Sequence, residues 1–168
     1  MAGRNWAVYE DDFWAIDECL NKFVSGSYCR GVALIDRTGQ LITTIGDFPD
    51  IDIDAFASLA AADFAANREL ATLVGETDFS TLVHQGADHG LYFQLIADRV
   101  ILAGLFDKAT TLGLVRFQAK RAASRLGAIL EKLFDKIESG GLEDVEDVAL
   151  GAGFAEEAGA EFDSLFGD

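Results

Sequence analysis

Residues 31–45 read GVALIDRTGQLITTI, and this stretch decides the fold. Two short runs in it are apolar and partly β-branched, as strands are, namely residues 32–35 and 41–45. Between them, Asp36, Arg37, Thr38 and Gly39 have the residue types of a turn. Two such runs joined by a short loop that contains glycine predict a β-hairpin.

The segment before the hairpin has a helical period. Its large apolar residues recur at intervals of three and four, which places them on one face of a helix. They are Phe13, Ile16, Leu20, Phe23 and Val24. Asp11 and Asp12 precede them, where carboxylates suit the positive end of the helix dipole, and Gly26 suits the stop. We therefore expect a first helix over about 11–26.

The segment after the hairpin indicates a second helix and then three strands. Asp52 or Asp54 can cap a helix that runs to about Val74, and Gly75 can end it. Three apolar runs follow at residues 81–84, 91–96 and 100–106. Because only short polar segments separate these runs, they predict an antiparallel meander.

A last helix completes the domain. Thr110 or Thr111 can cap it, and apolar residues at helical spacing continue to Ile137. The expected order is αββαβββα over residues 9–137. This order predicts an α+β fold, with a five-stranded, mainly antiparallel sheet sandwiched by helices.

The charge of the chain argues against nucleic acid as a partner. The formal net charge of the 168 residues is −16, so phosphate would be repelled.

No apolar run approaches the ~20 residues of a membrane span, and the first ten residues lack the core of a signal peptide. We therefore expect a cytoplasmic protein without membrane insertion. Cys19 and Cys29 are expected to be buried, reduced thiols rather than a disulfide or a metal site.

The sequence lacks the motifs of common enzymes. It has no GxxxxGK[ST] loop, no GxGxxG after a strand and no GxSxG elbow. His84 and His89 flank residues 85–88 (QGAD), which have good turn chemistry, so a hairpin loop is favoured over a metal or catalytic pair. We expect no catalytic residues, no metal and no cofactor.

The second helix has two candidate faces. Phe56, Leu59, Leu70 and Leu73 are expected to pack on the sheet. A stripe of mostly small residues lies elsewhere on the helix, namely Ala57, Ala61, Ala65, Arg68 and Thr72. This stripe could be a protein-docking face with Asp63, Arg68 and Glu69 as rim charges, or alanine could stand there simply as the best helix former.

The C-terminal part of the chain is acidic and ends in apolar residues. Residues 138–168 hold ten acids and no Lys or Arg, which leaves 19 acids against 13 bases in residues 1–137. Residues 138–160 have the composition of a flexible linker, and residues 161–168 contain Phe162, Leu165 and Phe166 at helical spacing. Such a trio suits capture by a groove, in cis or on a partner, rather than an idle tail.

The sequence resembles the Roadblock family, and within it the bacterial polarity proteins that act on a Ras-like GTPase in motile cells. The resemblance rests on residues 31–36 (GVALID), 39–42 (GQLI), 59–60 (LA) and 111–116 (TLGLVR), and it resumes at 162–166 (FDSLF). It implies a homodimer whose sheets join edge to edge, with the two second helices side by side. One dimer is then expected to engage one GTPase through that helical face.

The resemblance also implies which residues meet the GTPase. It carries Ala61, Ala65, Glu69 and Thr72 over as contacts to the switch regions, with Arg68 less closely matched, because a small residue stands there in the family pattern. The family accelerates GTP hydrolysis by rearranging the GTPase's own catalytic residues, and its C-terminal segment, matched here by Phe162, Leu165 and Phe166, favours nucleotide exchange. Arg68 keeps open the alternative of an arginine finger.

Other functions stay open at this point. The chain could be a non-catalytic dimeric scaffold that tethers partners, and similar folds can also enclose small ligands. Trp6 and Trp14 have no counterpart in the family pattern.

Overall fold

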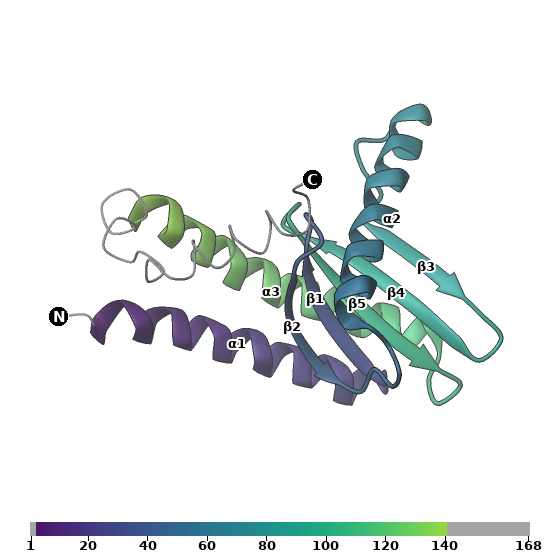
Figure 1. Cartoon of the computed structure of the whole chain (residues 1–168), viewed down its shortest axis with the longest axis horizontal. Helices are drawn as coiled ribbons and strands as arrows, with labels where there is room; N and C mark the ends of the chain where they lie inside the picture. Colours follow the sequence, from purple (N-terminus) through teal and green to yellow (C-terminus); the bar gives the residue numbers. More distant parts are fainter. Residues whose placement is uncertain (1–2, 141–168) are drawn as a thin grey trace, which may run out of the picture. The chain divides into compact units, whose positions relative to one another are not determined.

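The computed structural model describes residues 3–140, with side chains from Glu10 to Ser139. The elements follow the expected order, and Figure 1 shows their arrangement. They are α1 (Gly3–Ser27), β1 (Gly31–Asp36), β2 (Leu41–Gly46), α2 (Ile53–Leu73), β3 (Thr81–Gln85), β4 (His89–Ile96), β5 (Val100–Asp107) and α3 (Leu112–Gly140). The chain divides into two compact units, Met1–Glu131 and Lys132–Asp168, and the sheet lies in the first.

The five strands form one antiparallel sheet in the order β2-β1-β5-β4-β3. The β1–β2 hairpin joins the β3–β4–β5 meander through β1 and β5, where for example Ala33 pairs with Ala103. This arrangement leaves β2 and β3 as the edge strands. The expected α+β fold and its strand order along the chain are confirmed.

One face of the sheet packs against α2. Alternation along the strands directs Ala33, Ile35, Phe93, Ile101 and Ala103 to this face, where they form one cluster with buried residues of α2. The ring of Phe64 on α2 packs in a T-shaped arrangement with the ring of Phe93, with 6.1 Å between the ring centroids. This interface fixes which side of α2 is buried.

The other face of the sheet packs against α1 and the first part of α3. A Cβ atom on Gly104 of β5 would lie 3.3 Å from the ring of Phe23 on α1, and one on Gly127 of α3 would lie 3.9 Å from Ile96 on β4. The two helices contact each other where the thiol of Cys19 lies 3.8 Å from the carbonyl oxygen of Ala122. Helices therefore cover both faces, as expected (Figure 1).

The N-terminal caps of α2 and α3 are the residues that the sequence predicts, whereas α1 starts earlier than predicted. The Asp52 carboxylate accepts a hydrogen bond from the Ala55 amide at 3.1 Å, and the Thr111 hydroxyl accepts one from the Leu114 amide at 3.3 Å. Helix α1 begins at Gly3 rather than near Asp11, because no proline or internal glycine breaks the preceding residues. Phe13, expected on its packed face, is half exposed.

Among the described helices, none has an apolar stretch long enough to cross a bilayer.

Candidate functional site

Helix α2 buries its small residues and exposes its leucines, so the expected orientation of the helix is wrong. Ala57 and Ala61, expected in an exposed stripe, are 0% and 7% exposed. Leu59 and Leu73, expected to pack on the sheet, are 70% and 81% exposed. Phe56 does pack on the sheet as expected.

Aromatic rings explain this orientation. The rings of Phe56 and Phe64 both approach Phe93 of the sheet, with centroids 6.4 and 6.1 Å away. Because these rings fill the space between α2 and the sheet, the positions between them have room only for methyl groups, and Ala57 and Ala61 occupy them.

The exposed side of α2 carries a continuous apolar stripe. We call this set the outer stripe of α2: Leu59, Ala62, Ala66, Leu70 and Leu73. Its members recur at intervals of three and four, so they form one line along the helix. Exposed leucines aligned in this way make the outer stripe a candidate surface for association with protein.

Four of the five residues expected to contact a partner are exposed, on the flank of α2 between the outer stripe and the buried side of the helix. Ala65, Arg68, Glu69 and Thr72 all reach the surface. Ala61, the fifth, lies on the buried side and offers almost no surface. The structure therefore keeps the second helix as a candidate docking element but moves its exposed face by roughly a third of a turn.

An ionic cluster ties the end of α2 to the turns of the sheet. Asp78, in the loop after α2, accepts a hydrogen bond at Oδ2 from Nη2 of Arg37, at 2.9 Å. Nη1 of Arg37 donates to the carbonyl oxygen of Asp98 at 2.7 Å. Nε of Arg68 lies 4.0 Å from the same Oδ2 atom of Asp78. Asp78 is outside any recognisable motif, so its role in this ionic cluster could not be predicted from the sequence.

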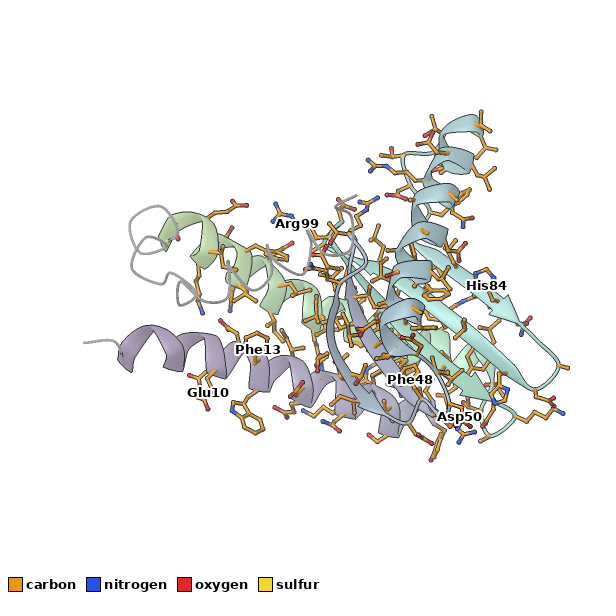
Figure 2. The ribbon with its side chains drawn as sticks, viewed as in Figure 1. Glu10, Phe13, Phe48, Asp50, His84 and Arg99 are labelled. Carbon is orange, nitrogen blue, oxygen red and sulfur yellow. The ribbon has the colours of Figure 1, made fainter. Side chains whose placement is uncertain are left out.

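A second polar contact ties α2 to the edge strand β3. Nε2 of His84, which Figure 2 labels on β3, lies 2.6 Å from Oδ2 of Asp63 on α2. The His84 ring packs at a steep angle against the ring of Phe93, with 5.7 Å between the ring centroids. Asn67 donates to the other oxygen of Asp63 at 2.9 Å. His89 begins β4, and the expected hairpin between the two histidines is present, although His84 itself belongs to the strand.

The candidate metal ligands and thiols of the described residues can be stated individually. Among them, no group of three or more His, Cys, Asp or Glu residues could hold a metal ion. Cys19 and Cys29 are buried and free, as expected, and burial raises the pKa of both thiols, so they are poor nucleophiles. A hollow of about 640 Å³ beside the β3–β4 hairpin is lined mainly by apolar groups, including Phe56, Leu91 and Leu105.

Two sets of sequence-selected residues are not described structurally. Phe162, Leu165 and Phe166 lie outside the described residues, as do residues 141–160 of the expected linker and the side chain of Trp6. Residues 138–140, where the linker was expected to begin, belong to α3. Trp14 is two-thirds exposed on α1.

Comparisons with known proteins agree with this fold. A family model described as the Roadblock/LC7 domain matches residues 15–106. The structure of MglB from Myxococcus xanthus is similar over 70% of this chain and 95% of its own, with 38% identity and a TM-score of 0.67. The gliding protein MglB from Thermus thermophilus is similar over 72% of this chain and 92% of its own, with 31% identity and a TM-score of 0.69.

The chain is also similar to an MglB structure with a tetrameric arrangement and to an archaeal protein. A structure described as MglB with a tetrameric arrangement is 32% identical, covers 72% of this chain and 91% of its own, and has a TM-score of 0.69. An uncharacterised protein of Methanocaldococcus jannaschii is 27% identical over 115 residues, which are 68% of this chain and 98% of that protein.

Proposed function

Since the chain belongs to the Roadblock/LC7 family, and within it is similar to MglB, we propose that it is a homodimeric regulator of a Ras-like GTPase of the MglA type. The observation that carries this proposal is the exposed surface of α2, which consists of the outer stripe and, farther around the helix, of Ala65, Arg68, Glu69 and Thr72. A surface of this kind binds protein.

We propose that the dimer forms through β3 and α2. Strand β3 is an edge of the sheet, so one side of its backbone has amide and carbonyl groups free to pair with a second copy. Pairing of β3 with its symmetry mate would bring two copies of α2 together. The leucines of the outer stripe would then be covered in part by the partner helix.

The paired helices would form the docking surface for one GTPase. Ala65 and Thr72 are small, so they allow a switch region to approach the backbone of α2, and Arg68 and Glu69 supply charges at the rim. Acceleration of GTP hydrolysis would come from rearrangement of the GTPase's own catalytic residues. The regulator would then need no catalytic site, and no cofactor or metal.

A second part of the proposal concerns the C-terminus. Phe162, Leu165 and Phe166 would dock on the GTPase away from the α2 surface and promote nucleotide exchange. Residues 138–160 would act as an acidic linker between the domain and this docking segment.

Ala65→Arg tests the docking surface. The substitution places a long charged side chain where close approach is required, so we expect stimulation of hydrolysis by the cognate GTPase to fall at least about tenfold. Phosphate release under multiple turnover measures the effect. Ala128→Arg is the matched control, because Ala128 is an alanine of α3, on the opposite side of the sheet. Full stimulation by Ala65→Arg would show that the surface lies elsewhere.

The alternative function is a non-catalytic scaffold. A scaffold would bind GTP-loaded and GDP-loaded GTPase equally, or would not bind either form, whereas a regulator of hydrolysis prefers one of them. A pull-down with the GTPase in each nucleotide state separates the two functions.

A further inference from the structure

The Arg68 guanidinium has one edge directed to its own protein and one edge free. Its Nε atom lies 4.0 Å from Oδ2 of Asp78. Arg68 is about half exposed, and the structure describes no other acceptor for its guanidinium among residues 3–140. With Nε directed inward, the Nη1 and Nη2 edge of the guanidinium is available to a partner.

Asp78 is held firmly enough to orient an arginine. Its side chain is only 16% exposed, and Nη2 of Arg37 donates to it at 2.9 Å. Arg37 is fixed in turn, because its backbone amide donates to the carbonyl oxygen of Arg99 at 3.0 Å and its Nη1 donates to that of Asp98 at 2.7 Å. A carboxylate held by the turns of the sheet is thus placed beside the exposed side of α2.

Arg37 satisfies only one oxygen of the Asp78 carboxylate. Its Nη2 atom donates to Oδ2, whereas Oδ1 is buried without a hydrogen-bond partner among the described residues. Arg68 approaches the same Oδ2 atom and leaves Oδ1 unpaired, so at a half-exposed site it adds little stability to the carboxylate. What the second contact does change is the freedom of Arg68. It restricts a long side chain to conformations that present its fork outward, so less conformational entropy is lost on binding.

We propose that Asp78 orients Arg68 to receive a carboxylate of the GTPase in a two-hydrogen-bond contact at the rim of the α2 surface. This inference rests on the proposed function and extends it. Arg68 is a specificity-determining residue and Asp78 is a positioning residue. A carboxylate is the fitting acceptor because the outer edge of a guanidinium matches its two oxygens. An arginine whose Nε faces a carboxylate of its own domain, 4.0 Å away, is not extended toward a partner's nucleotide site as an arginine finger must be.

The test is a titration of the cognate GTP-loaded GTPase with the full chain. It yields the half-maximal concentration and the maximal rate of hydrolysis. We expect Arg68→Ala to raise the half-maximal concentration about tenfold and to leave the maximal rate unchanged. Asp78→Asn should raise it about threefold. If Asp78 acts through Arg68, the double variant should match Arg68→Ala, so that the two effects do not add.

A conservative variant and a control complete the design. Arg68→Lys keeps the charge but loses both Nε and the fork, so it should bind as weakly as Arg68→Ala. It tests the fork without touching Asp78, in case Asp78→Asn lowers the melting temperature. Arg116→Ala, an exposed arginine on α3, should bind like the unaltered chain.

Several results would overturn the inference. Full affinity in Arg68→Lys would show that charge alone matters, and additive effects of the two substitutions would make Asp78 a structural residue only. A fall in maximal rate of about a thousandfold for Arg68→Ala would instead identify an arginine finger. If the unaltered chain neither binds nor stimulates the GTPase, the proposed function fails, and that outcome is distinct from all of these.

Discussion

Gly90 lies directly beneath the ring of Phe106, and this contact needs the absence of a side chain. A Cβ atom at Gly90 would lie 2.3 Å from Cζ of Phe106 and 2.7 Å from both Cε atoms. The ring is buried, so it covers the glycine on the face of the sheet that packs against α1 and α3. The pair fills a gap between β4 and β5 that two side chains could not share.

Gly90→Ala should therefore destabilise the fold. The methyl group would push the Phe106 ring out of its buried position, and overpacking of this kind lowers the free energy of unfolding by about 1–3 kcal/mol. Urea denaturation followed by circular dichroism measures the change. Gly113→Ala is the matched control: nothing lies within 4 Å of a Cβ atom there, and helix propensity favours alanine over glycine by up to about 1 kcal/mol. Equal stability of Gly90→Ala and the unaltered chain would contradict the steric argument.

At the scale of single residues, the sequence predicts the features that local chemistry determines. Asp52 and Thr111 were recognisable as caps because a cap needs only a short polar side chain before a helical period. Asp78 was not recognisable, because its partners Arg37 and Arg68 come from segments that only the folded chain brings together. Ion pairs between distant segments leave no periodic signal in a sequence.

At the scale of elements, α2 shows why amphipathic patterns can mislead. Its leucines were expected to face the sheet, because leucine is the more hydrophobic residue and is buried more often. The sheet beneath α2 already carries Phe93, and α2 itself contributes Phe56 and Phe64, so alanines fit the remaining space. The helix period was correct, and the choice of face depended on side chains from other elements.

The outer stripe predicts the dimer contact. Leu70→Glu places a charge in an apolar surface that a second copy would desolvate, so we expect the dimer to dissociate at least about a hundredfold more readily. Light scattering after size exclusion, over a range of concentrations, measures the mass.

The matched control for this prediction lies on the other side of the sheet. Phe117 on α3 is 56% exposed and Leu70 is 54% exposed, so Phe117→Glu makes a similar change at a similar exposure. That variant should remain dimeric. A dimeric Leu70→Glu variant, or a monomeric Phe117→Glu variant, would place the contact away from α2.

At the scale of the whole molecule, charge and docking elements are separated. The chain has a net charge of −16, and ten of its acids fall in residues 138–168. Two such chains repel each other, and salt screens this repulsion. Association through the outer stripe of α2 should then depend on apolar burial. The acidic C-terminal segment lies far from α2 in sequence, so its contribution to GTPase control can be removed separately.

Deletion of residues 160–168 tests this separation. The deletion removes Phe162, Leu165 and Phe166 and leaves α2 and β3 intact, so dimerisation and most of the stimulation of hydrolysis should persist. Nucleotide exchange should slow by about tenfold, because loss of an apolar anchor typically weakens the affinity of an interface by a factor of that size. Release of a fluorescent GDP analogue from the GTPase measures exchange.

A full-length control distinguishes the apolar anchor from the charge of the tail. Substitution of Phe162, Leu165 and Phe166 by serine keeps every acid of the segment, so it should slow exchange as much as the deletion does. Neutralising Glu161 and Asp163 as Gln and Asn keeps the apolar residues and should have a smaller effect, which decreases further at high salt. Unchanged exchange in the deletion variant would limit the segment to solubility. In that case control of the GTPase would rest on the α2 surface alone.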